Sequence, residues 1–202
     1  TREADPPVFW LIHGADGSLH LYGKTEATRV ADPDAPGRIA TWLLCESMNA
    51  RGEHIAYVYK ADDQDPDPIN DFRAQRYVER VCYGNFTASK DLYAWTVENL
   101  ADPGWHFQLL FDYGERTTSL TEVPAYDGET LQPWPARVDP FSTYGQGFEI
   151  STRRLCRQML MFHHFPQELG AKPVLVRRLL LQYQTTSLDY THLVAAHYQA
   201  YD

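Results

Sequence analysis

Asp-Pro pairs divide this sequence and limit the length of any helix that it can form. Proline removes a backbone hydrogen-bond donor, and the residue before it is pushed out of the helical region of backbone space. Each pair therefore predicts a loop. Most pairs are separated by about 27–37 residues, which is the length of a long hairpin plus its connection. The pairs begin at residues 5, 32, 65, 67, 102 and 139.

Two hairpins are predicted near the start of the chain. Val8–Ile12 and Leu19–Tyr22 are apolar runs that flank a turn containing Asp16-Gly17, and Asp-Gly between such runs is a strong hairpin signal. Ile39–Ser47 and His54–Tyr59 flank a second turn that ends in glycine. Both patterns favour antiparallel β structure.

Later segments also alternate with the period of a strand. Trp105–Tyr113 has five apolar residues at alternate positions and is the clearest predicted strand. Arg76–Tyr83 alternates as well, and a short helix is predicted around Leu92–Val97. A further apolar face is predicted from four residues, namely Leu175, Leu179, Leu181 and Tyr183.

Phe148–Phe165 is ambiguous. Leu155, Met159 and Phe162 fit a helical stripe, and Thr152 is a suitable helix cap. Strand alternation in this segment is poor, so the local pattern slightly favours a helix.

Composition excludes several classes of protein. The chain has 202 residues, of which 44% are hydrophobic and 13% aromatic, so it is too rich in aromatic residues for a disordered chain. Its net charge of −9 argues against nucleic acid or an anionic membrane as the main partner. No apolar run approaches the roughly 20 residues of a membrane helix, so no membrane insertion is expected. The loops at 61–71 and 117–135 lack the composition of an interdomain linker, which predicts one domain over residues 1–202.

The sequence has few candidate catalytic or metal-binding residues. It contains no G-x-S-x-G, phosphate loop, G-x-G-x-x-G or H-E-x-x-H motif, and no Glu-x-Glu pair. His163 and His164 with Cys156 are the most suggestive cluster, but adjacent histidines diverge and a metal needs three or four converging ligands. The three cysteines, which include Cys45 and Cys82, are too few and too scattered for a disulfide framework or a zinc site. We expect no catalytic residue, cofactor or metal.

Tryptophans and arginines are the remaining candidates for binding. The five tryptophans could line a sugar-binding face, although core packing is the better expectation. A basic concentration in this acidic chain is a candidate contact for a partner, with salt bridges to nearby carboxylates as the alternative. It consists of Arg153, Arg154, Arg157, Arg177 and Arg178.

Six blocks of sequence resemble the SpvB family, which is named for the Salmonella virulence plasmid B protein. The amino-terminal part of the B component of insecticidal Tc toxin complexes resembles the same blocks. The match runs in order from about residue 9 to residue 201, and Arg153–Gly170 (RRLCRQMLMFHHFPQELG) is its most specific part. The others are Phe9–Thr25, Trp42–Tyr59, Arg76–Asn85, Phe111–Arg116 and Asp139–Ile150. The sequence departs from the family at Ser151, where arginine is usual.

The resemblance implies a non-enzymatic structural or delivery domain of a secreted bacterial toxin, built from long antiparallel hairpins. It shifts Phe148–Phe165 towards strand, paired with Val174–Tyr183. Its partners would be other toxin subunits or the rest of its own chain. In SpvB-type proteins this region precedes a separate domain that ADP-ribosylates actin, whereas in Tc toxins the B and C components form a shell around the toxic cargo. The sequence does not decide whether the parent protein is an SpvB-type effector or a Tc toxin B component. A receptor- or partner-binding module and a cryptic enzyme are also retained as alternatives.

Overall fold

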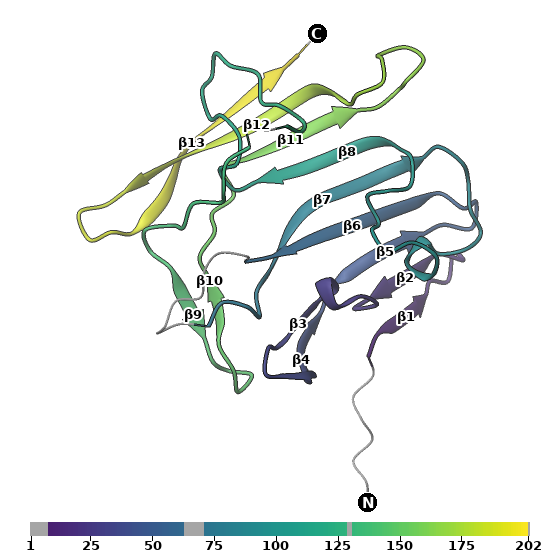
Figure 1. Ribbon diagram of the computed structural model, residues 1–202, viewed down its shortest axis with the longest axis horizontal. Coiled ribbons are helices and arrows are strands. Elements are labelled where there is room, and N and C mark those ends of the chain that lie inside the picture. The colour runs from purple at the N-terminus through teal and green to yellow at the C-terminus, as the bar shows by residue number, and fades with distance from the viewer. Residues whose placement is uncertain (1–7, 63–70, 129–130, 202) are drawn as a thin grey trace, which may run out of the picture. The chain divides into compact units, whose positions relative to one another are not determined.

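The computed structural model describes residues 8–62, 71–128 and 131–201 (Figure 1). Strands account for 46% of it and helix for 3%, so the predicted mainly antiparallel β fold is confirmed. Two compact units are present: Thr1–Trp105 with Ser142–Thr152, and His106–Phe141 with Arg153–Asp202. That residues 1–202 act as one domain stays a prediction. Within the described residues, no helix is long and apolar enough to cross a membrane.

An antiparallel sheet of five strands forms the first unit, in the order β1-β2-β5-β6-β7. Both predicted hairpins are present in it, as β1–β2 and β5–β6. The strands are β1 (Trp10–His13), β2 (Leu19–Tyr22), β5 (Leu44–Met48), β6 (His54–Ala61) and β7 (Arg76–Asn85).

One predicted strand is in fact two. The run Ile39–Ser47 breaks at Leu43, and its first part belongs to β4 (Ala35–Trp42), which pairs with β3 (Arg29–Asp32) in a separate sheet. Leu43 lies where the two pairings meet: its amide donates to the Thr28 carbonyl, next to β3, and its carbonyl accepts from the Gly23 amide, next to β2. The uninterrupted apolar run concealed this change of sheet, because Leu43 is as apolar as its neighbours.

Short elements complete the first unit. A helix was predicted around Leu92–Val97, and a single 3-10 turn, η2 (Tyr93–Trp95), is present there. A second turn, η1 (Glu26–Thr28), precedes β3, and β9 (Phe141–Thr143) pairs with β10 (Ile150–Thr152). The core lies under the β5–β6 hairpin and η2, and it consists of Leu21, Cys45, Met48, Ala56, Cys82, Leu92, Ala94, Leu100 and Trp105.

Four antiparallel strands form the sheet of the second unit, in the order β8-β11-β12-β13 (Figure 1). The ambiguous segment is not helical: Phe148–Phe165 contains the strands β10 and β11, towards which the family resemblance pointed, and residues 153–157 between them belong to neither a helix nor a strand. β11 pairs with β12 across the predicted turn. The strands are β8 (Trp105–Asp112), β11 (Gln158–His163), β12 (Val174–Thr185) and β13 (Thr191–Ala200).

On β8, the face opposite to the alternating apolar residues is the more deeply buried one. Phe107, Leu109 and Phe111 are only half-buried, whereas Gln108 and Asp112 are buried on the opposite face. Burial of these two polar side chains is possible because both are hydrogen-bonded. Gln108 Oε1 accepts from the Tyr126 hydroxyl at 2.8 Å, and Asp112 Oδ1 accepts from a loop amide at 2.8 Å.

A β-bulge explains a second difference in β12. The predicted face combined Leu175 with Leu179 and Leu181, but the buried leucines are Leu175 and Leu180. The pairing with β11 skips Val176, so the alternation changes phase at that point. The core of this unit is formed by Leu110, Leu160, Phe162 and Leu175, with Tyr126 and Tyr201 packed against it.

Asp139 ties the long loop of the second unit to the start of β13. Its carboxylate accepts from Arg137 Nε at 2.8 Å, from the Thr191 amide at 2.7 Å and from the Thr191 hydroxyl at 2.9 Å. The Arg137 guanidinium, followed by the Thr191 amide, holds the pKa of Asp139 below its ordinary value of 3.8.

We expect a pH-dependent difference in stability between the wild-type chain and Asp139→Asn. A depressed pKa in the folded state stabilises the fold above the pKa of the unfolded chain, and this contribution is lost as the pH falls through the folded value. The wild-type chain should therefore be the more stable at pH 7, and the two midpoints of urea unfolding should converge in strong acid. If the two midpoints differ by the same amount at pH 7 and in strong acid, the depressed pKa of Asp139 is contradicted.

Candidate functional site

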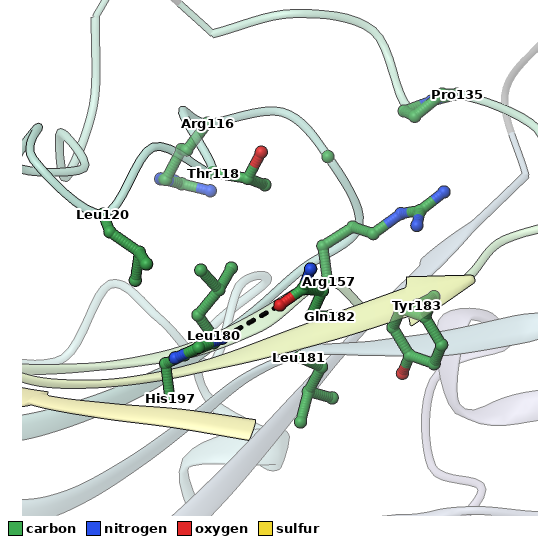
Figure 2. Close-up of a pocket in the computed structure, with 11 residues that line it drawn as sticks. Arg116, Thr118, Leu120, Pro135, Arg157, Leu180, Leu181, Gln182, Tyr183 and His197 are labelled. Carbon is green, nitrogen blue, oxygen red and sulfur yellow. Dashed lines mark hydrogen bonds between the residues drawn. The ribbon is translucent and has the colours of Figure 1, made fainter. Parts of the chain in front are cut away.

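A pocket of about 570 Å³ lies on the sheet of the second unit, under the loop that follows β8 (Figure 2). The loop contributes one wall, and β12 and β13 contribute the floor. Figure 2 shows the long side chain of Arg157 extending towards Pro135 at one side of the pocket. The lining residues are Gly114, Arg116, Thr118, Leu120, Pro135, Arg157, Leu180, Leu181, Gln182, Tyr183 and His197.

The sequence FDYGER shapes the start of the loop. Asp112 Oδ1 accepts from the Gly114 amide and so closes a turn at the end of β8. Gly114 has φ +110, and a Cβ atom there would lie 2.7 Å from Pro135 Cγ. Glycine is therefore required both for the backbone conformation and for the close approach of the loop.

Arg116 is the hub of the same loop. Its Nη1 lies 3.1 Å from Asp112 Oδ2 and 3.5 Å from Glu115 Oε2, while Nε and Nη2 donate to the carbonyls of Ala125 and Tyr126. Burial raises the pKa of Glu115, opposed by a hydrogen bond from Trp134. The charge of Arg116 is thus already compensated, and its role is to hold the wall of the pocket.

The arginines predicted as partner contacts do not lie together. Arg154 is buried and donates to the Trp134 carbonyl, and Arg153 is half-buried. Arg178 is fully buried, while its neighbour Arg177 is exposed. Arg157, half-buried, is the only one of the five that lines the pocket of Figure 2.

Arg178 is a buried cation that hydrogen-bonds to neutral acceptors. Nε donates to Gln158 Oε1 at 2.6 Å, Nη2 to the Thr117 carbonyl at 3.1 Å, and Nη1 to the Ser119 carbonyl at 2.8 Å and to Gln199 Oε1 at 3.2 Å. It thereby joins β11, β12 and β13 to the loop above them. The alternative of salt bridges to carboxylates does not describe this residue.

Arg157 and Arg177 have only aromatic partners for their guanidinium groups within the described residues. Arg157 lies 5.6 Å from the centre of the Tyr183 ring, and Arg177 lies 6.0 Å from that of Tyr198. Cation–π contacts of this kind leave the N–H groups available to another molecule. Of the five predicted arginines, Arg177 is exposed, and Arg153 and Arg157 are half-buried.

The remaining candidate clusters are separated or structural. Within the part of the chain that the structure describes, no three His, Cys, Asp or Glu residues are arranged to hold a metal. His163 packs edge-on to Phe107 at 5.0 Å, and burial lowers its pKa. Gly147 closes a turn by donating to the Tyr144 carbonyl.

The cysteines are free thiols. Burial raises the pKa of Cys82 to about 12 and that of Cys156 to about 11, and it also raises the pKa of Cys45. Thiols with such pKa values are poor nucleophiles and poor metal ligands at neutral pH.

The tryptophans do not form one strip. Trp105 and Trp134 are buried in different units. Trp10 packs edge-on to Trp42 at 6.1 Å, and Trp95 lies beneath Lys24 Nζ at 4.2 Å.

Sequence reasoning missed a buried histidine–glutamate pair in the first unit. His54 Nδ1 lies 2.6 Å from Glu46 Oε1, and both side chains are fully buried. Glu46 also accepts from the amides of Tyr93 and Ala94 at 2.9 Å, and His54 Nε2 donates to the Ser89 carbonyl at 3.0 Å. The two residues stand on adjacent strands of the predicted β5–β6 hairpin, but nothing in the sequence indicated that η2 would cover them.

Comparison with known proteins gives a consistent result. The family model described as "SpvB: Salmonella virulence plasmid 65kDa B protein" matches residues 1–165. The mono(ADP-ribosyl)transferase SpvB of Salmonella typhimurium (strain 14028s) is 48% identical over 200 residues, which are 96% of this chain and 33% of that protein. The chain therefore spans about a third of the length of the curated relatives that it matches.

Two solved structures share the fold closely. The structure of the N-terminal domain of the effector SpvB from Salmonella typhimurium strain LT2 matches with a TM-score of 0.88 and 48% identity, over 96% of this chain and 61% of that one. A chain in the structure of the Photorhabdus luminescens Tc holotoxin pore matches with a TM-score of 0.84 and 40% identity, over 94% of this chain and 9% of that one.

Proposed function

The chain belongs to the SpvB family, and from this premise we propose that it is a non-catalytic structural or delivery domain of a bacterial toxin. One observation carries the proposal: the same β structure recurs, at 40% identity, within a much longer chain of a Tc holotoxin pore. A segment found both in an effector and in a multi-component toxin is expected to provide a scaffold rather than the toxic activity. We further propose that residues 1–202 act as one domain and that the parent protein is secreted or delivered to a host cell.

The two faces of the β8 strand differ in a way that suits the wall of a toxin shell. On β8 the side chains of Phe107, Leu109 and Phe111 are half-exposed, while the opposite face carries the core of the second unit. Antiparallel sheets tolerate one face in contact with solvent or another layer. Other toxin subunits, or the remainder of the same chain, are the partners that we propose for these faces and for Arg157 and Arg177.

A second candidate function is a partner-binding module of a single-chain effector. The curated relatives are named mono(ADP-ribosyl)transferases, and the chain spans 33% of their length. On this alternative a separate carboxy-terminal domain of the parent modifies actin, and this chain supplies recognition.

Capture of partners from the source cells separates the two candidates. The tagged chain is used as bait, and Arg157→Glu and Arg177→Glu are compared with the wild-type chain by mass spectrometry. Recovery of a channel-forming or shell-completing protein, reduced in either variant, supports a toxin-complex scaffold. Recovery of no such protein favours the single-chain effector.

We expect the isolated chain to transfer no ADP-ribose to actin. The chain is incubated with NAD labelled on the adenine and with purified actin, and the modified actin is measured against a known actin ADP-ribosyltransferase as positive control. Labelling of actin above the level without added chain would overturn the structural assignment.

A further inference from the structure

The pocket of Figure 2, named here the Arg157 pocket, presents hydrogen-bond donors that the fold does not use. The Arg157 guanidinium has no hydrogen-bond acceptor or carboxylate partner within the described residues, and its neighbour is the Tyr183 ring. Gln182 Oε1 accepts from His197 Nε2 at 3.0 Å, which leaves the amide NH₂ group of Gln182 free (Figure 2). The hydroxyl of Thr118 also lacks a partner among the described residues.

The charge of the pocket is positive although the chain is acidic. The whole chain has 27 acidic and 18 basic residues, yet no Asp or Glu lines the pocket. The second guanidinium, that of Arg116, contacts Asp112 and Glu115 inside the loop. Among the residues that line the pocket, Arg157 is therefore the guanidinium without a carboxylate partner.

Apolar residues also line the pocket. Pro135 lies where the Arg157 side chain extends, Leu181 belongs to β12, and Leu120 comes from the loop at the opposite side of the pocket (Figure 2). A ligand that fits these surfaces has an acceptor-rich anionic group next to an aliphatic group.

We propose that the Arg157 pocket binds a carboxylate that a partner's polypeptide presents beside an aliphatic side chain. The proposal rests on the partner docking proposed above and gives it a chemistry. The planar fork of a guanidinium matches the two oxygens of a carboxylate. A single positive charge balances a carboxylate but leaves a phosphate dianion half-compensated.

Two peptides test the proposal on the complete chain. The probes are acetyl-Ala-Leu-Asp-Leu-Ala-amide and the same peptide with Asn in place of Asp, and the readout is the NMR signal of the Arg157 Nε–H group during titration. We expect the Asp peptide to shift this signal saturably and to bind at least about tenfold more tightly than the Asn peptide, which is the effect of losing one charge-assisted hydrogen bond.

Matched variants locate the effect. Arg157→Gln should weaken binding of the Asp peptide by about tenfold, as expected for the same lost charge-assisted bond, followed in this variant by the Thr118 amide signal. Arg51→Gln, which removes an arginine that is 83% exposed and does not line the pocket, should leave binding unchanged. Equal binding of the Asp and Asn peptides, or equal loss in both variants, would overturn the proposal.

Inorganic phosphate provides the remaining comparison. Displacement of the Asp peptide by phosphate at equal concentration would overturn the preference for a carboxylate. The results distinguish this proposal from the proposed function. Partner capture without peptide binding rejects only the carboxylate-binding role of the Arg157 pocket. Peptide binding without partner capture rejects only the docking role of the chain.

Discussion

Replacing Arg178 by methionine is expected to lower the free energy of unfolding by about 3–5 kcal/mol. Methionine fills a similar volume, so the loss comes from hydrogen bonds and not from a cavity. The substitution removes the donor to Gln158 Oε1, which is buried, and to the Ser119 carbonyl, which is half-buried, whereas Gln199 Oε1 keeps the Tyr201 hydroxyl. Each buried polar group left unsatisfied costs about 1–3 kcal/mol.

Exchange of a buried ion for an apolar residue is not always destabilising, because removal of the ion also removes its desolvation cost. In this chain, the hydrogen-bond partners of Arg178 determine whether its replacement stabilises or destabilises the fold. The Thr117 and Ser119 carbonyls belong to the loop. Without Arg178 the Ser119 carbonyl stays unpaired or draws water under the loop, while the Thr117 carbonyl keeps Gln158 Nε2 as its donor. We therefore expect Arg178→Met to lower the midpoint of urea unfolding and also to loosen the contact between the loop and the sheet.

Arg177→Met is the matched control, because Arg177 is the neighbouring residue in the same strand and is exposed. Its guanidinium lies over the Tyr198 ring, so a change within about 0.5 kcal/mol is expected. Urea unfolding followed by tryptophan fluorescence measures both variants. Equal midpoints for Arg177→Met and Arg178→Met would show that the buried hydrogen bonds contribute nothing.

Replacing Glu46 by alanine is the second change with a large expected effect, a loss of about 3–5 kcal/mol in the free energy of unfolding. The carboxylate is fully buried and serves three donors, which are His54 Nδ1 and the amides of Tyr93 and Ala94. Without it the His54 ring keeps only its bond to the Ser89 carbonyl. The 3-10 turn η2 loses the acceptor for its first amides.

Amide hydrogen exchange gives this prediction a local readout. In Glu46→Ala the amides of Tyr93 and Ala94 should exchange faster than the global loss of stability requires, because the group that protects them is gone. Glu53→Ala is the control, since Glu53 is 62% exposed and interacts with Asn49 and Arg51 at the turn. Unchanged protection of Tyr93 and Ala94 in Glu46→Ala would contradict the role of Glu46 as the acceptor for their amides.

The fold was predictable where the sequence contains both a turn signal and two flanking runs with the pattern of a strand. The hairpin around Asp16-Gly17 is present with Trp10 opposite Tyr22. Inward faces were harder to predict, because alternation of apolar residues marks a strand but does not say which face is covered. On β8 the side chain of Gln108 is inside with a partner far along the loop, the Tyr126 hydroxyl, whereas buried Asp112 accepts from Gly114, two residues away.

The candidate site was predictable in composition but not in arrangement. The sequence singled out five arginines, and neighbours as close as Arg177 and Arg178 have opposite exposures. Strand alternation implies that such neighbours diverge, but which of them faces the core depends on the bulge beside Val176. The walls of the Arg157 pocket come from a loop whose path is fixed by Gly114 and Arg116, and no local pattern encodes that path.

The free cysteines have a consequence for passage between cellular compartments. Since Cys45, Cys82 and Cys156 form no disulfide, none of them contributes a covalent cross-link to the folded chain. Their raised pKa values keep the reactive thiolate scarce at neutral pH, and thiolate is the form that exchanges with glutathione or with an oxidised partner. Exchange at these positions is therefore slow in the folded chain, and the fold does not depend on a disulfide that the reducing cytosol would break.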